Sequence, residues 1–290
     1  MTSGGYFVDA TFGGGGHSKE ILKHLETGKL IGFDQDNQAT RNLPDDENLI
    51  FVNHNFQYFK NFLKYYEMFP CDGILADLGV SSHQIDTADR GFSFRFDADL
   101  DMRMDQGQKQ SAKEIIANYT EQELARIFHL YGEFKRSRQV ARAIVQARSL
   151  SPIYTTNQLK SVVEPFLDKK HHNKGLAQIF QALRIEVNEE MAVLTTFLRE
   201  TVSALKPGGR LVVLTYHSLE DRLVKNLIQK GNIEGKPEQD FYGNVIRPFT
   251  PINRKPLLAT DEEMERNPRA RSAKLRIAVR NEDEPINPAK

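Results

Sequence analysis

The first candidate site in the sequence is a run of four glycines, Gly13–Gly16, inside the segment DATFGGGGHS. It follows a β-rich run at Tyr6–Ala10 and precedes a stretch of helical character from about His17 to Leu25. Glycines carry no Cβ, so their amides can approach a ligand closely, and a helix start adds unpaired N–H groups and partial positive charge. The turn therefore suits a carboxylate or a phosphate, although a turn that only requires positive φ has the same sequence.

The carboxylate of Asp34 restricts the class of ligand that the glycine turn could bind. Asp34 follows the β-rich run Lys29–Phe33 and lies 21 residues after Gly13. In nucleotide-binding α/β folds an acid ~20 residues after the glycine turn holds a ribose. An ionised carboxylate only accepts hydrogen bonds, so it can satisfy both ribose hydroxyls. The alternative for Asp34 is a solvated aspartate at a strand end.

The residues after the glycines distinguish between three classes of ligand: a dinucleotide, a nucleotide bound by a Walker A loop, and S-adenosylmethionine. The dinucleotide fingerprint requires glycine where Ser18 stands, and a Walker A loop requires lysine followed by serine or threonine, which His17-Ser18 does not supply. S-adenosylmethionine fits better, because its carboxylate suits the helix-start amides, its ribose suits Asp34 and no pyrophosphate is needed. A dinucleotide-dependent dehydrogenase and a non-catalytic RNA-binding or assembly factor that keeps the fold stay open as alternatives.

A third constellation, ADLGVSSHQ, begins at the end of the β-rich run Gly73–Ala76. Ligands of open parallel sheets bind at the carboxyl ends of the strands. Asp9, Asp34 and Asp77 all fall at such ends, so we expect them to gather at one pocket.

The elements around these residues predict an α/β fold: a mostly parallel sheet with helices on both faces and an inserted all-α subdomain. Residues 231–265 are expected to form a long loop, and a strong turn signal stands at Lys206–Gly209. Further strands are expected at Leu49–Val52, Arg210–Tyr216 and Lys274–Val279, and further helices at Gln57–Glu67, Leu176–Leu205 and Leu219–Lys230.

The middle of the chain has a different pattern. Thr120 and Glu123 form a capping box, and three amphipathic helical stretches follow with no strand between them. We therefore expect a helical domain at 106–170 that is inserted into a discontinuous α/β domain, residues 1–105 and 171–290.

Net charge, cysteine count and hydropathy restrict the partners that the chain can bind. The 290 residues contain 39 Lys and Arg against 39 Asp and Glu, so affinity for nucleic acid must come from local patches. The one cysteine, Cys71, excludes an intrachain disulfide and a CxxC zinc site. With no apolar stretch near the ~20 residues that cross a bilayer and no signal-peptide pattern, we expect a cytoplasmic protein without membrane contact.

Six motifs in order carry a resemblance: DATFGGGGHS, DLGVSSHQ, DRGFSF, LDMRMD, PGGRL with the following YHSLEDR, and NPRARSAKLR. Together they resemble the family of bacterial small-subunit ribosomal RNA methyltransferases that methylate the N4 amine of a decoding-region cytosine. The resemblance runs from residue 9 to residue 280. It implies a Rossmann-like methyltransferase that depends on S-adenosylmethionine, with the cofactor bound by residues 1–105 and 171–290 and RNA or substrate recognised by the helical domain 106–170. Its partner would be 16S rRNA or the small ribosomal subunit, and it would act as a monomer or weak homodimer.

The resemblance also implies residue roles. Its cofactor-binding positions correspond here to Gly15, Gly16, His17, Asp34, Phe56, Asp77 and Gln84. Phe56 has a physical role there as a flat face for adenine, with core packing as the alternative.

The reaction requires a proton acceptor near a weakly nucleophilic amine. We expect Asp77 to be the first candidate and His217, after the strand Arg210–Tyr216, the second. His217, Glu220 and Asp221 also resemble a metal-ligand set, but Ser218 and Asp221 have the spacing of a helix cap, so no metal is expected.

Two basic segments and one mixed segment are candidates for RNA contact. Residues 266–280 carry six basic side chains and no acid, residues 133–148 carry five against one acid, and Arg90–Phe96 interleaves arginines with aromatic rings. Such patches bind phosphates and stack unpaired bases. The candidate nucleic-acid residues are Arg90, Arg95, Arg269 and Arg271, and a solvated surface is the alternative for each patch.

Overall fold

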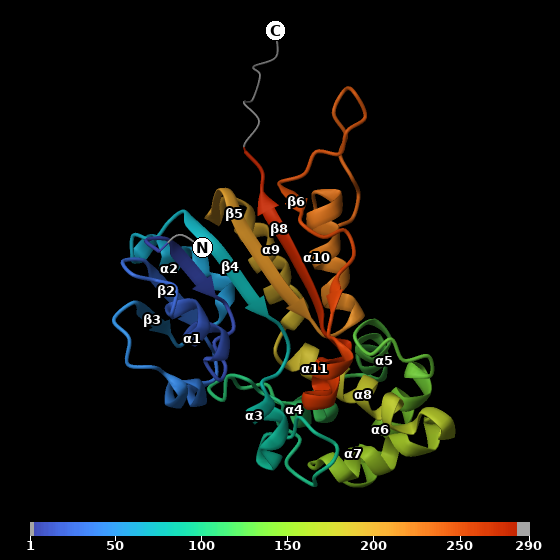
Figure 1. The fold of residues 1–290 in the computed structure, drawn as a ribbon. Helices are drawn as coiled ribbons and strands as arrows, with labels where there is room; N and C mark the ends of the chain where they lie inside the picture. Colours follow the sequence, from blue (N-terminus) through green and yellow to red (C-terminus); the bar gives the residue numbers. More distant parts are fainter. Residues whose placement is uncertain (1–2, 283–290) are drawn as a thin grey trace. The chain divides into compact units, whose positions relative to one another are not determined.

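The computed structural model describes residues 3–282 and divides into two compact units (Figure 1). The sheet unit consists of Met1–Gly79 and Met191–Lys290, and the helical unit of Val80–Glu190. The helical unit extends further in both directions than the segment 106–170 expected from the sequence. No helix of the described residues combines the length and apolar character needed to span a bilayer.

The sheet unit is built on one mixed sheet with the order β3-β2-β1-β4-β5-β8-β6. The first five strands in this order are parallel, and β8 is antiparallel to its neighbours. Its strands are β1 (Tyr6–Asp9), β2 (Lys29–Phe33), β3 (Leu49–Val52), β4 (Cys71–Asp77), β5 (Leu205–Thr215), β6 (Phe249–Pro251), β7 (Leu257–Leu258), which pairs with β8, and β8 (Lys274–Arg280). The predicted Rossmann-like order is therefore confirmed, with its switch point between β1 and β4.

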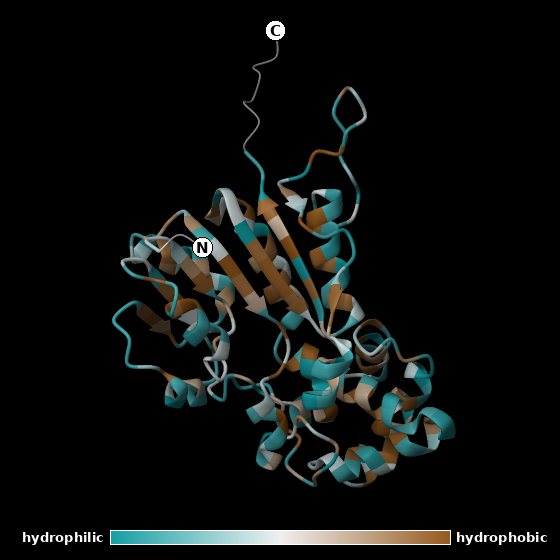
Figure 2. Cartoon of the chain, in the orientation of Figure 1, coloured by the Kyte–Doolittle hydropathy of each residue, from teal (hydrophilic) through white to brown (hydrophobic). Residues whose placement is uncertain are grey.

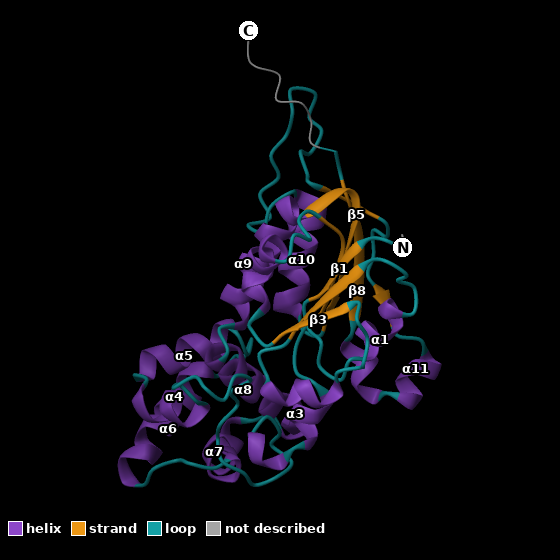
Figure 3. Ribbon diagram, turned by 90° about the vertical axis from the view of Figure 1, so that its left-hand side faces the viewer, coloured by secondary structure: helices purple, strands orange, loops and turns teal. Residues whose placement is uncertain are grey.

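Helices cover both faces of this sheet. In Figure 3 α9 (Glu190–Ala204) and α10 (Ser218–Lys230) lie on one side of the sheet and α1 (Gly16–Leu22) on the other. The core between them is apolar, as the brown strands of Figure 2 show, and it includes the contact between Phe59 of α2 (Phe59–Tyr65) and Phe197 of α9, whose ring centroids are 5.1 Å apart. Fully burying one such large apolar side chain contributes about 1.5–3 kcal/mol.

The helical unit has a separate apolar core. The predicted capping box is present, because the Glu123 N–H donates to Thr120 Oγ1 (3.2 Å) and the Thr120 N–H donates to Glu123 Oε2 (2.7 Å). Its elements are α3 (Ser82–Asp86), α4 (Ala112–Asn118), α5 (Glu121–Leu130), α6 (Ser137–Leu150), α7 (Thr156–Val163), the 3₁₀ turns η4 (Glu164–Phe166) and η5 (Lys169–His171), and α8 (His172–Val187).

Three expectations for the second half of the chain were wrong. The long helix Leu176–Leu205 is two helices, α8 and α9, because Glu189 has a φ of 50° and the Asn188 side chain donates to the Arg184 carbonyl (2.8 Å). The turn expected at Lys206–Gly209 lies inside β5 as a bulge, opposite Asp72, with Gly208 at a φ of 80°. The long loop contains β6, β7 and α11 (Asp261–Arg266).

Candidate cofactor site

The glycine turn after β1 has the backbone that its sequence predicts. Gly13 and Gly15 have φ of 50° and 75°. A Cβ on Gly15 would lie 2.9 Å from the Phe12 ring, whereas a Cβ on Gly14 or Gly16 would meet no described atom within 4 Å. The turn therefore exposes bare backbone at Gly14 and Gly16, where a ligand can approach.

Asp34 is bound to this turn through its carboxylate. The Gly13 N–H donates to Oδ2 (2.8 Å) and the Asp36 N–H donates to Oδ1 (2.8 Å). Each oxygen thus keeps a lone pair for one more donor. Burial raises the pKa of Asp34 to about 6, because the loss of water outweighs the two backbone hydrogen bonds. The carboxylate is ionised at neutral pH and becomes protonated in mild acid.

Asp77, at the end of β4, lies between two other polar side chains. The Tyr216 hydroxyl donates to Oδ1 (2.9 Å), and Nε2 of His17 lies 3.4 Å from Oδ2. The hydrogen bond to Asp77 raises the pKa of His17, whose side chain is about half exposed. Burial, followed by the charge of Asp77, raises the pKa of Tyr216, so its hydroxyl stays a neutral donor.

Asp9 has a structural role instead. It is fully buried, Ser18 Oγ donates to its Oδ2 (2.7 Å), and the Thr11 N–H donates to its Oδ1 (3.1 Å). Burial raises its pKa. Asp9 therefore ties the end of β1 to α1. The charge of Asp77 contributes to the raised pKa of Asp9, and that of Asp9 contributes to the raised pKa of Asp34, so the three acids lie near one another as expected, with Asp9 fully buried.

Phe56 lies four residues after the end of β3, in a 3₁₀ turn (Phe56–Tyr58). Its ring is half buried and meets Phe197 edge to face at 5.1 Å. Asn55 begins this turn by accepting the Gln57 N–H on Oδ1 (3.0 Å), and its Nδ2 donates to Gln35 Oε1 (2.9 Å). The segment that carries Phe56 is thereby fixed to the segment that follows Asp34.

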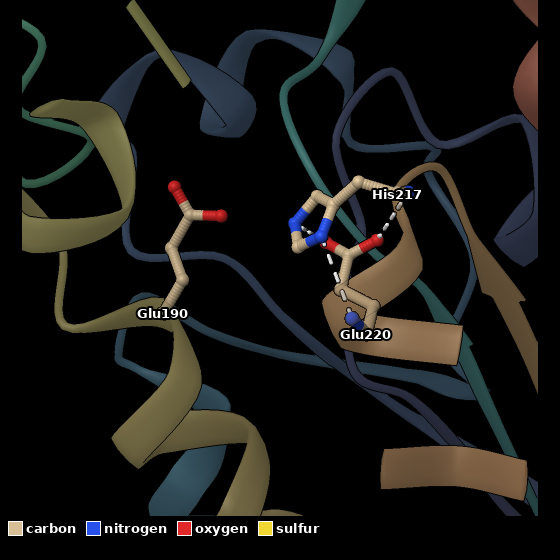
Figure 4. A group of neighbouring side chains, drawn as sticks. All are labelled: Glu190, His217 and Glu220. Atoms are coloured by element: carbon tan, nitrogen blue, oxygen red, sulfur yellow. Dashed lines mark hydrogen bonds and ion pairs between the residues drawn. The ribbon is translucent and has the colours of Figure 1, made fainter. Parts of the chain in front are cut away.

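His217 caps α10, a role that the sequence assigned to Ser218. Its Nδ1 accepts the Glu220 N–H (3.4 Å), and Glu220 Oε2 accepts the Tyr216 N–H (2.8 Å). Figure 4 shows the imidazole against the Glu220 carboxylate, with Nε2 3.0 Å from Oε1. Asp221 accepts from Arg276 Nε (2.7 Å) and does not join His217, so the metal-ligand set considered from the sequence does not form. Glu190, also drawn in Figure 4, is assigned to the helical unit.

The remaining predicted residues of the helical unit have unlike surroundings. Gln84 is buried and caps α3, accepting the Ser81 N–H on Oε1 (3.0 Å). Arg90 is buried and donates to the carbonyls of Arg103 (2.9 Å) and Met104 (3.2 Å), so its guanidinium supports a loop. Arg95 is exposed.

The C-terminal basic segment is less available than its charge suggests. Arg276 and Lys274 pair with Asp221, Arg280 donates to the Val202 carbonyl, and Arg266 pairs with Glu262. Of the two predicted contacts, Arg271 is exposed and Arg269 is half buried. The net charge of six therefore overstates the surface that this segment offers to RNA.

Tyr216 is the site residue that sequence reasoning missed. β4 and β5 are parallel neighbours with Asp77 paired to Leu214, so a residue just past Leu214 emerges beside Asp77. That register is the signal that identifies it.

A sheet with its switch point between β1 and β4, a glycine turn after β1 and a bound acid after β2 define a Rossmann-like, nucleoside-binding domain. Comparison with known proteins gives the family. The chain belongs to the MraW methylase family, whose model matches residues 1–281.

Curated relatives cover nearly the same length. "Ribosomal RNA small subunit methyltransferase H" of Parabacteroides distasonis is 58% identical over 94% of this chain and 90% of its own, and the Flavobacterium johnsoniae protein of that name is 55% identical over 94% and 91%. A solved rRNA methylase from Streptococcus thermophilus is a distant likeness, with 11% identity and a TM-score of 0.43 over 97% of this chain and 90% of that one.

Proposed function

We propose that this methylase transfers the methyl group of S-adenosylmethionine to the N4 amine of a cytosine in the decoding region of 16S rRNA. The observation that carries the proposal is Asp34, whose two oxygens each keep a lone pair while Gly13 and Asp36 hold them in place. The relatives' name supports ribosomal RNA as the substrate.

The residues present fit S-adenosylmethionine. Asp34 would accept from the ribose hydroxyls, and the turn at Gly15, Gly16 and His17, where the backbone of Gly16 is exposed, would take the methionyl end. Phe56 would lie against the adenine, and Asp77 and Gln84 complete the proposed set. When bound, this cofactor supplies an activated methyl group on a sulfonium.

The chain's own residues then act on the amine. A cytosine amine is a poor nucleophile, and an acceptor for its proton makes its lone pair available. Asp77 is the proposed acceptor, because Tyr216 holds Oδ1 and leaves Oδ2 toward His17. A proton received at Oδ2 lies 3.4 Å from Nε2 of a half-exposed imidazole, which offers a route to solvent. His217 is the second candidate.

RNA contacts are proposed at Arg95, Arg269 and Arg271, and the helical unit is proposed to take part in substrate recognition. Arg90 would contribute by shaping the loop that carries its neighbours. The protein is proposed to work in the cytoplasm on the small ribosomal subunit, as a monomer or weak homodimer.

The test is transfer of labelled methyl groups to small subunits from a strain that lacks the modification. We expect label in N4-methylcytidine after digestion of the 16S rRNA. A protein that binds S-adenosylmethionine but labels neither free rRNA nor subunits would instead be a non-catalytic factor.

A further inference from the structure

The helical unit contains an open cleft of about 450 Å³ that is lined by none of the proposed cofactor residues and by none of Arg95, Arg269 and Arg271, although most of its lining belongs to the basic segment 133–148. We call it the α6 cleft. Its volume lies within the ~300–1,000 Å³ typical of small-ligand sites. It is lined by Arg138, Gln139, Arg142, Ala143, Gln146 and Phe166. Five of these residues form one stripe along α6, and the sixth comes from η4.

Two of the five residues on this stripe, Arg138 and Arg142, are basic, and none is acidic. Residues 135–148 carry five basic side chains and no acid. Arg138 is exposed and forms no ion pair with another described residue, whereas Arg142 lies 3.4 Å from Glu121. Lys169 and Lys170, which are exposed and follow shortly after Phe166, are balanced by the exposed acids Glu164 and Asp168 of the same segment. The cleft therefore offers at least one guanidinium that no carboxylate neutralises.

The opposite wall is aromatic and held in place. Phe166 is half buried and packs against the core of the helical unit. Arg136 donates from Nη1 to the Phe166 carbonyl (3.3 Å), which fixes η4 to the start of α6. A positioned ring beside one guanidinium group that forms no ion pair matches the way proteins bind single-stranded nucleic acid, by stacking bases and contacting phosphates.

We propose that the α6 cleft binds an unpaired segment of the RNA substrate, with one base stacked on Phe166 and a flanking phosphate at Arg138. The exposed amides of Gln139 and Gln146 offer donors and acceptors for the edge of that base. An acidic protein segment would satisfy the arginines but would leave the ring and the amides without a matching partner. The proposal rests on RNA being the substrate and adds a second, separate contact with it.

The experiment measures binding of a fluorescent single-stranded oligoribonucleotide to the full chain over a range of salt concentrations. Arg138→Gln should weaken binding and lower the slope of log affinity against log salt by about 0.7, the value for one phosphate contact on a single strand. Phe166→Leu should weaken binding about tenfold with little change in slope, since stacking is not an ionic contact. Lys109→Gln removes one exposed charge of the same unit outside the cleft and should change neither.

Several outcomes would overturn the proposal. Equal effects of Arg138→Gln and Lys109→Gln would mean that only general charge matters. Poly-glutamate is the second probe and stands for an acidic protein segment. If Arg138→Gln loses binding to poly-glutamate but binds RNA as the wild type does, the cleft binds an acidic protein instead. Thermal unfolding shows whether Phe166→Leu weakens binding only by destabilising the helical unit. Arg138→Gln does not need this control, because the Arg138 side chain is exposed. A wild type that binds the oligonucleotide but transfers no methyl group would contradict the proposed function and leave this test intact.

Discussion

Replacing Asp34 with asparagine tests the cofactor site directly. The wild-type carboxylate keeps one lone pair on each oxygen after accepting from Gly13 and Asp36. Hydrogen bonds to a charged group contribute about 1.5–3 kcal/mol each, and neutral ones about 0.5–1.5. Asparagine keeps one acceptor and loses the charge, so we expect a loss of about 3 kcal/mol, which is roughly a 100-fold weaker dissociation constant for S-adenosylmethionine.

The fold of this variant should survive. Ionisation of Asp34 opposes folding at neutral pH, because its pKa is raised from 3.8 to about 6 by burial. Removing this charge offsets the loss of one backbone hydrogen bond, so the unfolding temperature should change little. Asp45→Asn, an exposed site in the same region, is the control with the same change in charge.

Isothermal titration with S-adenosylmethionine at several pH values completes this test. Ribose donors favour the ionised carboxylate, so wild-type affinity should fall as the pH drops below about 6, and that of Asp34→Asn should not. Unchanged affinity in Asp34→Asn at pH 7.5, or a flat wild-type profile between pH 7.5 and 5, would refute the role of Asp34.

Two further predictions concern neighbours of this site. Tyr216→Phe removes the hydroxyl that donates to Asp77 and should lower kcat about tenfold while the dissociation constant for S-adenosylmethionine stays within threefold, as single-turnover assays and calorimetry would show. Gly15→Ala places a Cβ 2.9 Å from the Phe12 ring at a φ of 75° and should lower the stability by at least ~1 kcal/mol in urea unfolding. In Gly14→Ala the new Cβ meets no described atom within 4 Å, so the stability should not change. The methyl group would cover exposed backbone and should weaken cofactor binding. Equal stabilities of the two alanine variants would contradict this account.

Local signals were sufficient for most of the sheet unit. The alternation of strand and helix and the glycine turn predict β1, α1 and β2, and the acid 21 residues later predicts that Asp34 belongs to the same site as the turn, where its carboxylate accepts the Gly13 N–H. These features depend on neighbours in sequence or on a register that parallel strands impose. The same logic extends to Tyr216, which only requires knowing that β4 and β5 are adjacent.

Features set by tertiary contacts were not predictable. The break between α8 and α9 interrupts a continuous apolar periodicity, and it depends on Asn188, whose side chain also donates to the Met102 carbonyl 86 residues away (2.8 Å). The burial of Arg90 likewise depends on carbonyls of Arg103 and Met104. A count of charges cannot distinguish arginines that hydrogen-bond inside the protein from arginines that are exposed to solvent. The number of basic residues in a segment is therefore larger than the number available to contact RNA.

The two candidate proton acceptors, His217 and Asp77, differ in the hydrogen bonds that each would lose on accepting a proton. His217 has a side chain that is 8% exposed, and its Nδ1 already accepts the Glu220 N–H, so the neutral ring carries its proton on Nε2. To act as a base it would have to leave the helix cap. Asp77 has Oδ2 beside a half-exposed imidazole. Accepting a proton there keeps the hydrogen bond from Tyr216 to Oδ1 and weakens only the contact with His17, which caps no helix.

Asparagine at each position distinguishes them. Asn is a good helix N-cap, so His217→Asn should keep the stability and lower single-turnover methyl transfer less than tenfold. Asp77→Asn should lower it by about 10²–10⁴, the usual contribution of a positioned base. A stable His217→Asn protein with the larger loss, and an Asp77→Asn protein that still transfers methyl groups at near the wild-type rate, would assign the proton to the imidazole and require α10 to uncap during the reaction.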